Sequence, residues 1–355
     1  MRVVVGMSGG VDSSVAALLL KKQGYDVVGV FMKNWEEKDD TDVCTAESDW
    51  RDVQQVCDLI GIPYYAVNFT QEYMDRVFSL FLREYEAGRT PNPDVLCNRE
   101  IKFKAFLDYA LSLEAEKIAT GHFVRTNEAG DLLRGADPAK DQSYFLYMLH
   151  DEQLKKSIFP VGGMTKAEVR ALAEKEGLPV SGKKDSTGIC FIGERNFRKF
   201  LSQYLPARPG DMVTPQGEVI GRHMGLMYYT LGQRRGLGIG GRGDGRRFFV
   251  VDKDLKNNRL IVVQGEDDER LYTCGCVCRD VTFVRERLTL NVPVSVTAKF
   301  RYRQPDQPCE ALYDGETIRF SFRERQRAVT PGQSAVIYDG DRVLGGGIID
   351  ELIRS

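Results

Sequence analysis

The sequence predicts an α/β fold, with a nucleotide-binding domain built on a parallel sheet and followed by two small β-rich units. Three observations predict it. Strand and helix signals alternate over residues 1–205, and β-type runs separated by glycine turns fill the remainder. The length of 355 residues also suits two or three domains. We therefore expect domains at residues 1–205, 206–270 and 271–355.

The first domain alternates in the order of a parallel sheet. Short apolar runs predict strands at residues 3–6, 25–32, 64–69 and 117–120. Helical patterns lie between or after them at residues 13–23, 48–60, 71–86 and 101–113. Such βαβ units are right-handed and bind ligands at the carboxyl ends of their strands.

The second half has almost no helical periodicity. Its clearest strand signals cover residues 247–251, 259–263, 292–300 and 335–338. The pairs Asp314-Gly315 and Asp339-Gly340 are candidate hairpin turns.

Composition narrows the class of protein. The eight cysteines are too few for a disulfide scaffold, and no apolar run approaches the length of a membrane span. No secretory signal peptide is recognisable, so we expect a cytoplasmic protein with no membrane partner. The net charge of −2 excludes a generally basic protein but leaves room for a local nucleic-acid-binding patch. Residues 1–200 carry a net −5 and the remainder +3, which places the basic excess in the β-rich half.

The strongest motif is Ser-Gly-Gly-Val-Asp-Ser at residues 8–13, between a predicted strand and a predicted helix. Glycines allow close backbone approach to phosphate, and the helix N-terminus offers free N–H groups. Asp12 can hold a magnesium ion that bridges phosphates. No Lys follows the glycines, so the motif differs from the GxxxxGK[ST] loop. The alternative is a turn that binds nothing.

Two other glycine patterns are predicted not to bind phosphate. Residues 177–184 match GxxxxGK but end in a second Lys where Ser or Thr is required, and Pro179 interrupts them. Residues 236–241 match GxGxxG but follow two arginines and precede a β-type run, the reverse of a dinucleotide site.

Two cysteines differ from the rest. Cys274, Cys276 and Cys278 alternate along a predicted strand and are expected to pack in its core. Cys97 lies in a polar loop expected just before a helix, and Cys190 has several basic neighbours. Both settings favour a reactive thiolate. Ordinary burial stays open for each of them.

An ordered set of segments runs over essentially the whole chain, at residues 6–13, 31–35, 92–98, 120–122, 140–144, 188–193, 232–237, 301–303 and 331–333. Together, these segments resemble the tRNA-specific 2-thiouridylases. The loop at residues 8–13 by itself resembles the PP-loop of the ATP pyrophosphatases. The resemblance to the 2-thiouridylases implies a Rossmann-like PP-loop domain, a small β-rich central domain and a C-terminal β-barrel. It also implies an ATP-dependent enzyme that places sulfur on the wobble uridine of tRNA.

The resemblance implies roles for particular residues. ATP phosphates would be held by Gly6, Met7, Ser8, Gly9, Gly10, Val11, Asp12 and Ser13, with Mg²⁺ bound alongside the nucleotide and no separate metal site. The backbones of Met32 and Gly121 would lie near the adenosine. The target base would meet Asn92, Pro93 and Asp94, while the anticodon stem-loop would contact His122, Lys140, Asp141, Gln142, Arg301, Tyr302 and Gln333.

The implied chemistry uses Cys190 as a persulfide carrier and Cys97 as a nucleophile. Adenylation of the uridine C2 oxygen makes it a leaving group, and sulfur then replaces it with release of AMP. The persulfide either attacks directly or is first opened by Cys97 to free hydrosulfide. Asp94, three residues before Cys97, can move a proton in one of these steps, and the alternative is an ordinary turn carboxylate. The sulfur would come from a partner such as a cysteine desulfurase or a relay protein.

Two other classes of function remain as alternatives. A small-molecule ligase can use the same nucleotide loop, although no glutaminase module is recognisable and paired loop cysteines have no use there. A non-catalytic RNA-binding protein can keep a nucleotide fold for structure alone.

Overall fold

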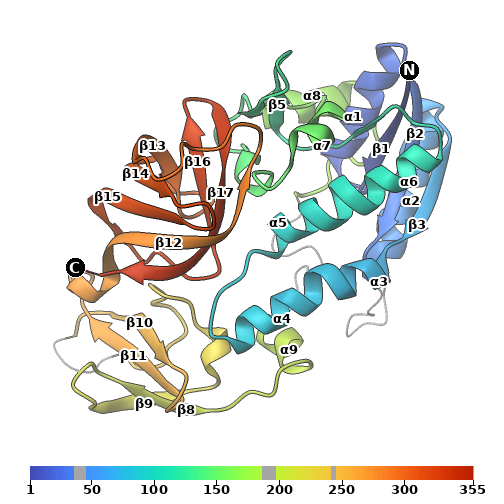
Figure 1. Cartoon of the computed structure of the whole chain (residues 1–355). Coiled ribbons are helices and arrows are strands. Elements are labelled where there is room, and N and C mark those ends of the chain that lie inside the picture. Colours follow the sequence, from blue (N-terminus) through green and yellow to red (C-terminus); the bar gives the residue numbers. More distant parts are fainter. Residues whose placement is uncertain (36–44, 186–196, 241–244, 355) are drawn as a thin grey trace.

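Residues 1–35, 45–185, 197–240 and 245–354 are described by the structure, a computed structural model (Figure 1). The N-terminal part contains a five-stranded sheet in the order β3-β2-β1-β4-β7, and every pairing in it is parallel. Its strands are β1 (Arg2–Met7), β2 (Asp26–Lys33), β3 (Tyr64–Asn68), β4 (Lys117–Ala119) and β7 (Ser157–Ile158). The sheet predicted from the alternating apolar runs is therefore confirmed.

Helices cover both faces of this sheet. On one face lie α1 (Val11–Lys22), α2 (Thr45–Ile60) and α8 (Lys166–Lys175), packed against Val3, Val5 and Met7. The other face, which includes Val4, packs against a helical stretch made of α3 (Thr70–Tyr73), π-helical η1 (Met74–Phe78) and α4 (Ser79–Glu86), and against a second stretch made of α5 (Pro93–Cys97), π-helical η2 (Asn98–Ala105) and α6 (Phe106–Ser112). Alternate residues of β1 thus enter opposite cores, as the pleat requires.

The helix that carries Cys97 starts earlier than the sequence predicts. The sequence predicts a polar loop over residues 91–98 before a helix at 101–113, but α5 begins at Pro93. Asn92 is its N-cap residue and Pro93 occupies the first turn, where a proline costs no hydrogen bond. The expectation of a loop was wrong because a proline suits the first turn of a helix as well as it suits a turn. Asp94 and Cys97 therefore lie on a helix.

Shorter elements complete the first part of the chain. They are the 3₁₀ helix η3 (Ser143–Phe145), α7 (Asp151–Lys155) and α9 (Phe197–Ser202). Among the described residues, no helix has the length and apolar character needed to cross a membrane.

The central β-rich unit is a four-stranded sheet in the order β10-β11-β8-β9. Its strands are β8 (Gly210–Val213), β9 (Val219–His223), β10 (Phe248–Asp254) and β11 (Arg259–Gln264), with the short 3₁₀ helix η4 (Leu226–Tyr228) after β9. A second short helix, η5 (Glu269–Leu271), leads from this sheet into the last part of the chain.

The last part is a closed barrel of six strands. They are β12 (Tyr272–Phe283), β13 (Val294–Lys299), β14 (Gln307–Tyr313), β15 (Ile318–Arg327), β16 (Ser334–Asp339) and β17 (Arg342–Ile353). The strands pair in the order β12-β15-β14-β13-β16-β17, and β17 pairs again with β12 to close the barrel. Cys276 and Cys278 lie fully buried in its core, as predicted. The same prediction was wrong for Cys274, which is only partly buried, because the pairing of β12 with β15 shifts register between Thr273 and Gly275.

One hairpin of the N-terminal part joins the barrel. Strands β5 (Val124–Thr126) and β6 (Leu132–Arg134) pair with each other, and β6 extends the barrel sheet beside β17 through the pair Leu133 and Arg342. Figure 1 shows the barrel beside the helical domain, with the central sheet below it. The predicted fold class, a parallel α/β domain followed by a small β domain and a β-barrel, is confirmed.

Candidate active site

The glycine loop joins the carboxyl end of β1 to α1. The Ser8 amide donates to the Ser13 hydroxyl at 3.2 Å, and the Gly10 amide lies 3.4 Å from the Ser8 hydroxyl. Gly9 has φ +71°, and a Cβ there would lie 2.7 Å from the backbone oxygen of Asp49. Since only glycine suits both that angle and that contact, the loop shape depends on Gly9.

The loop lies at the switch point of the sheet, where β1 and β4 are neighbours but the chain continues from them to opposite sides. Gly121 follows β4, and a Cβ on it would lie 2.6 Å from the backbone nitrogen of Ser13. A Cβ on Gly6 would lie 3.1 Å from the Met32 terminal methyl. Gly6 thus lies against Met32, and Gly121 lies against the start of α1 at Ser13.

The start of α1 fits a phosphate group. Its N-cap is Gly10, and no described side chain caps the helix. The first-turn N–H groups of a helix point outward and carry partial positive charge, so an uncapped N-terminus beside a glycine loop suits an anion. Among the described residues no group of three or more His, Cys, Asp or Glu side chains forms a metal site.

Lys183 braces this loop and was missed as a site residue. Its ammonium donates to the Gly9 carbonyl oxygen at 3.0 Å, to Asp49 at 2.7 Å and to Asp52 at 2.5 Å. Partial burial alone would lower the pKa of Lys183, but the two carboxylates outweigh it and the net shift is upward. Lys183 lies in the segment predicted not to form a second phosphate loop, and no spacing pattern connects it to Gly9.

A second ion cluster adjoins the loop. The Lys166 ammonium lies 2.6 Å from the Asp12 carboxylate and 2.9 Å from the Asp185 carboxylate. Asp185 also forms ion pairs with Lys140 at 2.6 Å and with Arg170 at 2.6 Å. Partial burial would raise the pKa of Asp185, but the three cations lower it well below its usual range. Lys140, predicted to contact tRNA, therefore lies in a network that ends at Asp12.

Asp94 and Cys97 both lie on α5, where Asp94 is partly buried and Cys97 is buried. The Cys97 side chain is 2% exposed. Burial raises the pKa of Asp94, and the ammonium of Lys102 opposes part of that rise. A carboxyl group with a raised pKa can hold or release a proton nearer neutral pH than an exposed one.

His122 lies within the influence of the same lysine. It is 8% exposed, and its Nδ1 is 2.8 Å from the Thr120 hydroxyl oxygen. Burial and the Lys102 ammonium lower its pKa far below 6.5, so the imidazole is neutral. Lys102 was also missed by the sequence analysis, because its charge acts here across the fold rather than through a motif.

Asp141 and Gln142 hold the backbone around them. The Asp141 carboxylate accepts the Gly135 amide at 3.0 Å and the Ser143 hydroxyl at 2.9 Å. The Gln142 side chain accepts the Phe123 amide at 2.9 Å. Both side chains are committed to internal hydrogen bonds in this structure.

The barrel residues predicted to contact tRNA also join parts of the protein. Arg301 donates to the Leu231 carbonyl oxygen of the central unit at 3.0 Å and to the Ala328 carbonyl oxygen at 2.7 Å. The Tyr302 ring is 4.4 Å from the Phe145 ring, centroid to centroid. Gln333 donates to the Thr90 carbonyl oxygen at 2.8 Å.

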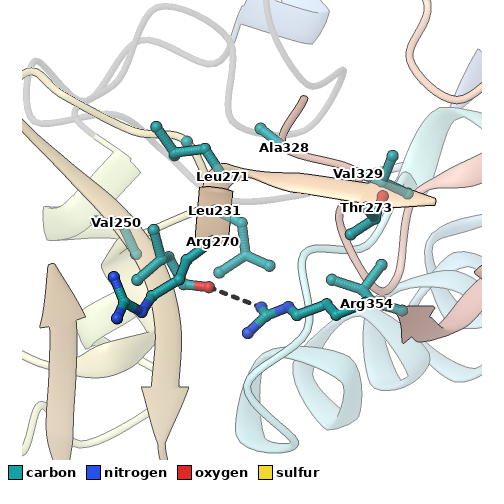
Figure 2. Close-up of a pocket in the computed structure, with 11 residues that line it drawn as sticks. Leu231, Val250, Arg270, Leu271, Thr273, Ala328, Val329 and Arg354 are labelled. Carbon is teal, nitrogen blue, oxygen red and sulfur yellow. Dashed lines mark hydrogen bonds between the residues drawn. The ribbon is translucent and has the colours of Figure 1, made fainter. Parts of the chain in front are cut away.

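A small crevice separates the central unit from the barrel. In Figure 2, Leu231 and Val250 of the central unit face Leu271, Ala328 and Val329 across it. Its volume is about 10 Å³, room for about one water molecule. The crevice is a tight domain junction and is too small for a nucleotide.

Cys190, the predicted persulfide carrier, lies outside the described residues, between Asp185 and α9. Asn92, Pro93, Asp94 and Cys97 are all described, and they share one helix start. The structure therefore describes the glycine loop and the helix that carries Asp94 and Cys97, and the pair of Cys97 with Cys190 stays a prediction.

A nucleotide-binding α/β enzyme joined to two β-rich domains is the class that this fold and loop define. Three family models match the chain in sequence order: the tRNA methyl transferase HUP domain over residues 1–194, the tRNA methyl transferase PRC-barrel domain over 198–264, and the aminomethyltransferase beta-barrel domain over 274–349. Their matches fall on the parallel-sheet domain, the central sheet and the barrel.

Curated relatives identify the family. The chain is 58% identical to a protein from Alkaliphilus oremlandii named tRNA-specific 2-thiouridylase MnmA, over 99% of this chain and 98% of that protein. It is 59% identical to the protein of that name from Geobacillus thermodenitrificans, over 100% of this chain and 96% of the relative. The chain belongs to the tRNA-specific 2-thiouridylase family. The resemblance seen in the sequence is confirmed.

Proposed function

We propose that this protein is an ATP-dependent tRNA sulfurtransferase that converts the wobble uridine, position 34, to 2-thiouridine. The observation that carries the proposal is full-length identity of 58% to a protein named for that activity. The uncapped glycine loop, the partly buried Asp94 and the buried Cys97 support it, because they supply an anion site, a proton carrier and a thiol within one domain.

The first step activates the base. The uridine C2 oxygen attacks the α-phosphorus of ATP, the bond to the β-phosphate oxygen breaks, and pyrophosphate leaves. We assign the phosphates to Gly6–Ser13 and the adenosine to the backbones of Met32 and Gly121. Mg²⁺ bound with the nucleotide would neutralise phosphate charge, and Asp12 is the loop carboxylate that would hold it. The helix N–H groups would stabilise the pyrophosphate.

The second step moves sulfur. In one route the terminal persulfide sulfur on Cys190 attacks C2 and AMP departs; Cys97 thiolate then attacks the Cys190 sulfur and releases 2-thiouridine. In the other, Cys97 attacks first and frees hydrosulfide, which displaces AMP from C2. Both routes end in a Cys97–Cys190 disulfide, which an external dithiol must reduce.

Asp94 is the proposed proton carrier for these steps. Its raised pKa suits proton transfer to or from a sulfur or the base. Asn92 and Pro93, at the start of the same helix, are proposed to meet the target base with it. The Lys102 ammonium lowers the pKa of both Asp94 and His122.

The target uridine lies in the anticodon loop of the tRNA, and an unpaired loop base can be flipped out of its stack at a low free-energy cost. We propose contacts from His122, Lys140, Arg301, Tyr302 and Gln333, and from the backbone of Asp141 and Gln142, whose side chains are engaged internally. A cysteine desulfurase or a sulfur-relay protein would load Cys190. A reducing cytoplasm fits the disulfide that each turnover leaves.

The proposal is tested by pyrophosphate release with unmodified tRNA and a persulfide donor present. Release that requires both tRNA and the protein, with one 2-thiouridine formed per AMP, is the expected result. Release stimulated by a small carboxylate or purine and not by tRNA would instead identify a small-molecule ligase.

A further inference from the structure

The helix that presents Asp94 and Cys97 is attached to the barrel just before it begins. The Thr90 amide donates to the Pro331 carbonyl oxygen at 2.9 Å, and the Gln333 amide nitrogen donates back to the Thr90 carbonyl oxygen at 2.8 Å. The same nitrogen lies 3.5 Å from the Pro91 carbonyl oxygen. Two residues later α5 starts, so these bonds fix the point from which it extends.

Close packing reinforces this attachment. Gly332 has φ +91°, and a Cβ on it would lie 2.9 Å from backbone atoms of Thr90. Only glycine allows the barrel segment to approach Thr90 this closely. The close packing therefore depends on Gly332 of the barrel as well as on Thr90, which precedes α5.

The barrel segment is itself rigidly held. The Gly332 amide donates to the Ile349 carbonyl oxygen at 2.7 Å, and the Ile349 amide donates to the Gln333 carbonyl oxygen at 2.8 Å. Ile349 is fully buried in the barrel core. Arg301 adds a bond to the neighbouring Thr330 hydroxyl at 2.8 Å. A segment held on both sides can transmit position to what it binds.

A second connection reaches the other end of α5. Asn98 directly follows Cys97, is buried, and donates to the Phe145 carbonyl oxygen at 3.0 Å. The Phe145 ring contacts the ring of Tyr302 on the barrel. The short helix is thus tied to the barrel before its first residue and after its last.

We propose that Gln333 is a positioning residue, which holds the Thr90 and Pro91 carbonyl oxygens and thereby sets where α5 presents Asp94 and Cys97 to the target base. This inference rests on the proposed function for its catalytic consequence, but the positioning itself is a property of the protein without RNA. Misplacement of reacting groups by about 1 Å costs about 10²-fold in rate.

The test compares Gln333→Glu, Gln333→Ala and Gln307→Ala. The first keeps the side-chain size but turns an acceptor toward two carbonyl oxygens. The third is the matched control, a barrel glutamine whose amide bonds to the Pro305 carbonyl oxygen within its own turn. Circular dichroism and thermal unfolding of each variant establish that it is folded.

The first readout is hydrogen–deuterium exchange of the peptide containing Thr90, in the full protein without RNA. We expect about tenfold faster exchange in both Gln333 variants and wild-type exchange in Gln307→Ala. Loss of the Gln333 bond to the Thr90 carbonyl oxygen weakens the adjacent bond from the Thr90 amide to the Pro331 carbonyl oxygen, which protects that amide. Unchanged exchange would overturn the proposal. This arm holds whether or not the protein thiolates tRNA.

The second readout separates positioning from RNA contact. Positioning predicts a fall in kcat of about tenfold or more at saturating tRNA, in addition to any loss of tRNA affinity that comes from the proposed contact of Gln333 with RNA. A weakened Kd with unchanged kcat would mean that Gln333 acts only as an RNA contact, and would overturn the assignment. If wild-type protein forms no 2-thiouridine, the proposed function fails while the exchange result still decides whether Gln333 holds the helix.

Discussion

Lys183 places its ammonium 3.0 Å from the carbonyl oxygen of Gly9, although 174 residues separate the two in sequence. The contact links the nucleotide loop to the segment that leads toward Cys190. Because Lys183 also holds Asp49 and Asp52, one side chain connects the loop, α2 and that segment. The loop geometry therefore depends on a residue outside the motif.

Replacing Lys183 by Met is expected to damage both stability and ATP use. The variant loses charge-assisted hydrogen bonds and leaves two carboxylates without their cation, at a cost of about 1–3 kcal/mol in unfolding free energy after solvent screening. The KM for ATP should rise about tenfold or more as the Gly9 anchor is lost. Urea unfolding and ATP-dependent pyrophosphate release measure the two effects. Lys175→Met, at an exposed position of α8, is the control, and equal behaviour of the two variants would contradict the role.

Asp94→Asn should lose activity without losing stability. Removing a proton carrier costs about 10²- to 10⁴-fold in rate. Since burial raises the folded-state pKa of Asp94, the folded protein binds more protons there than the unfolded chain, and its contribution to stability declines as pH rises through that pKa. The variant should therefore unfold at or above the wild-type temperature at pH 8, with a smaller difference near pH 4.

Calorimetry and single-turnover thiolation check this pair of effects, with Asp108→Asn on the exposed side of α6 as the control. A variant that loses activity only because it unfolds at a lower temperature would argue against a proton-transfer role.

Lys102→Met should shift the pH dependence of the reaction. The Lys102 ammonium lowers the pKa of Asp94, so its removal moves the limb of the pH–rate profile that belongs to Asp94 to higher pH. The same limb should be absent in Asp94→Asn. Lys104→Met, an exposed lysine paired with Glu100 at 3.1 Å, should leave the profile in place. A limb that stays fixed or moves to lower pH in Lys102→Met would show that Asp94 does not set it.

The two reactive cysteines should be distinguishable from the others by substitution. Cys97→Ser and Cys190→Ser should each reduce transfer from a persulfide donor by about 10³-fold or more, because a hydroxyl neither carries sulfur nor opens a persulfide at neutral pH. Cys274→Ser, on β12, should retain activity. Mass measurement of the loaded protein should place the additional sulfur on Cys190, and full activity of Cys190→Ser would remove its carrier role.

Local sequence determined much of the fold. The strand, glycine loop and helix at residues 2–22 follow one another directly along the chain. Their structure is set by neighbouring residues, so the strand and helix patterns of the sequence agree with the observed elements. The hairpin turns at Asp314-Gly315 and Asp339-Gly340 were recognisable for the same reason: each joins neighbouring strands of the barrel, and Gly315 and Gly340 have φ of +105° and +58°.

Long-range contacts were not recognisable. Gln333 and Thr90 are 243 residues apart, and only the folded chain brings them within 2.8 Å. The helix start at Pro93 was missed because proline is compatible with both a turn and a first helical turn. Nothing in the residue pattern of β5 and β6 indicates that this hairpin joins the barrel, since strand partners are chosen by tertiary packing.

The most direct test of the account is position-resolved mass spectrometry of unmodified tRNA incubated with the protein, ATP, Mg²⁺ and a persulfide donor. The expected result is a 16 Da increase at uridine 34 alone, the change from oxygen to sulfur, dependent on ATP and on both Cys97 and Cys190. Uridine 34 left unmodified under conditions in which the protein binds tRNA and releases pyrophosphate, or sulfur found only at another position, would contradict it.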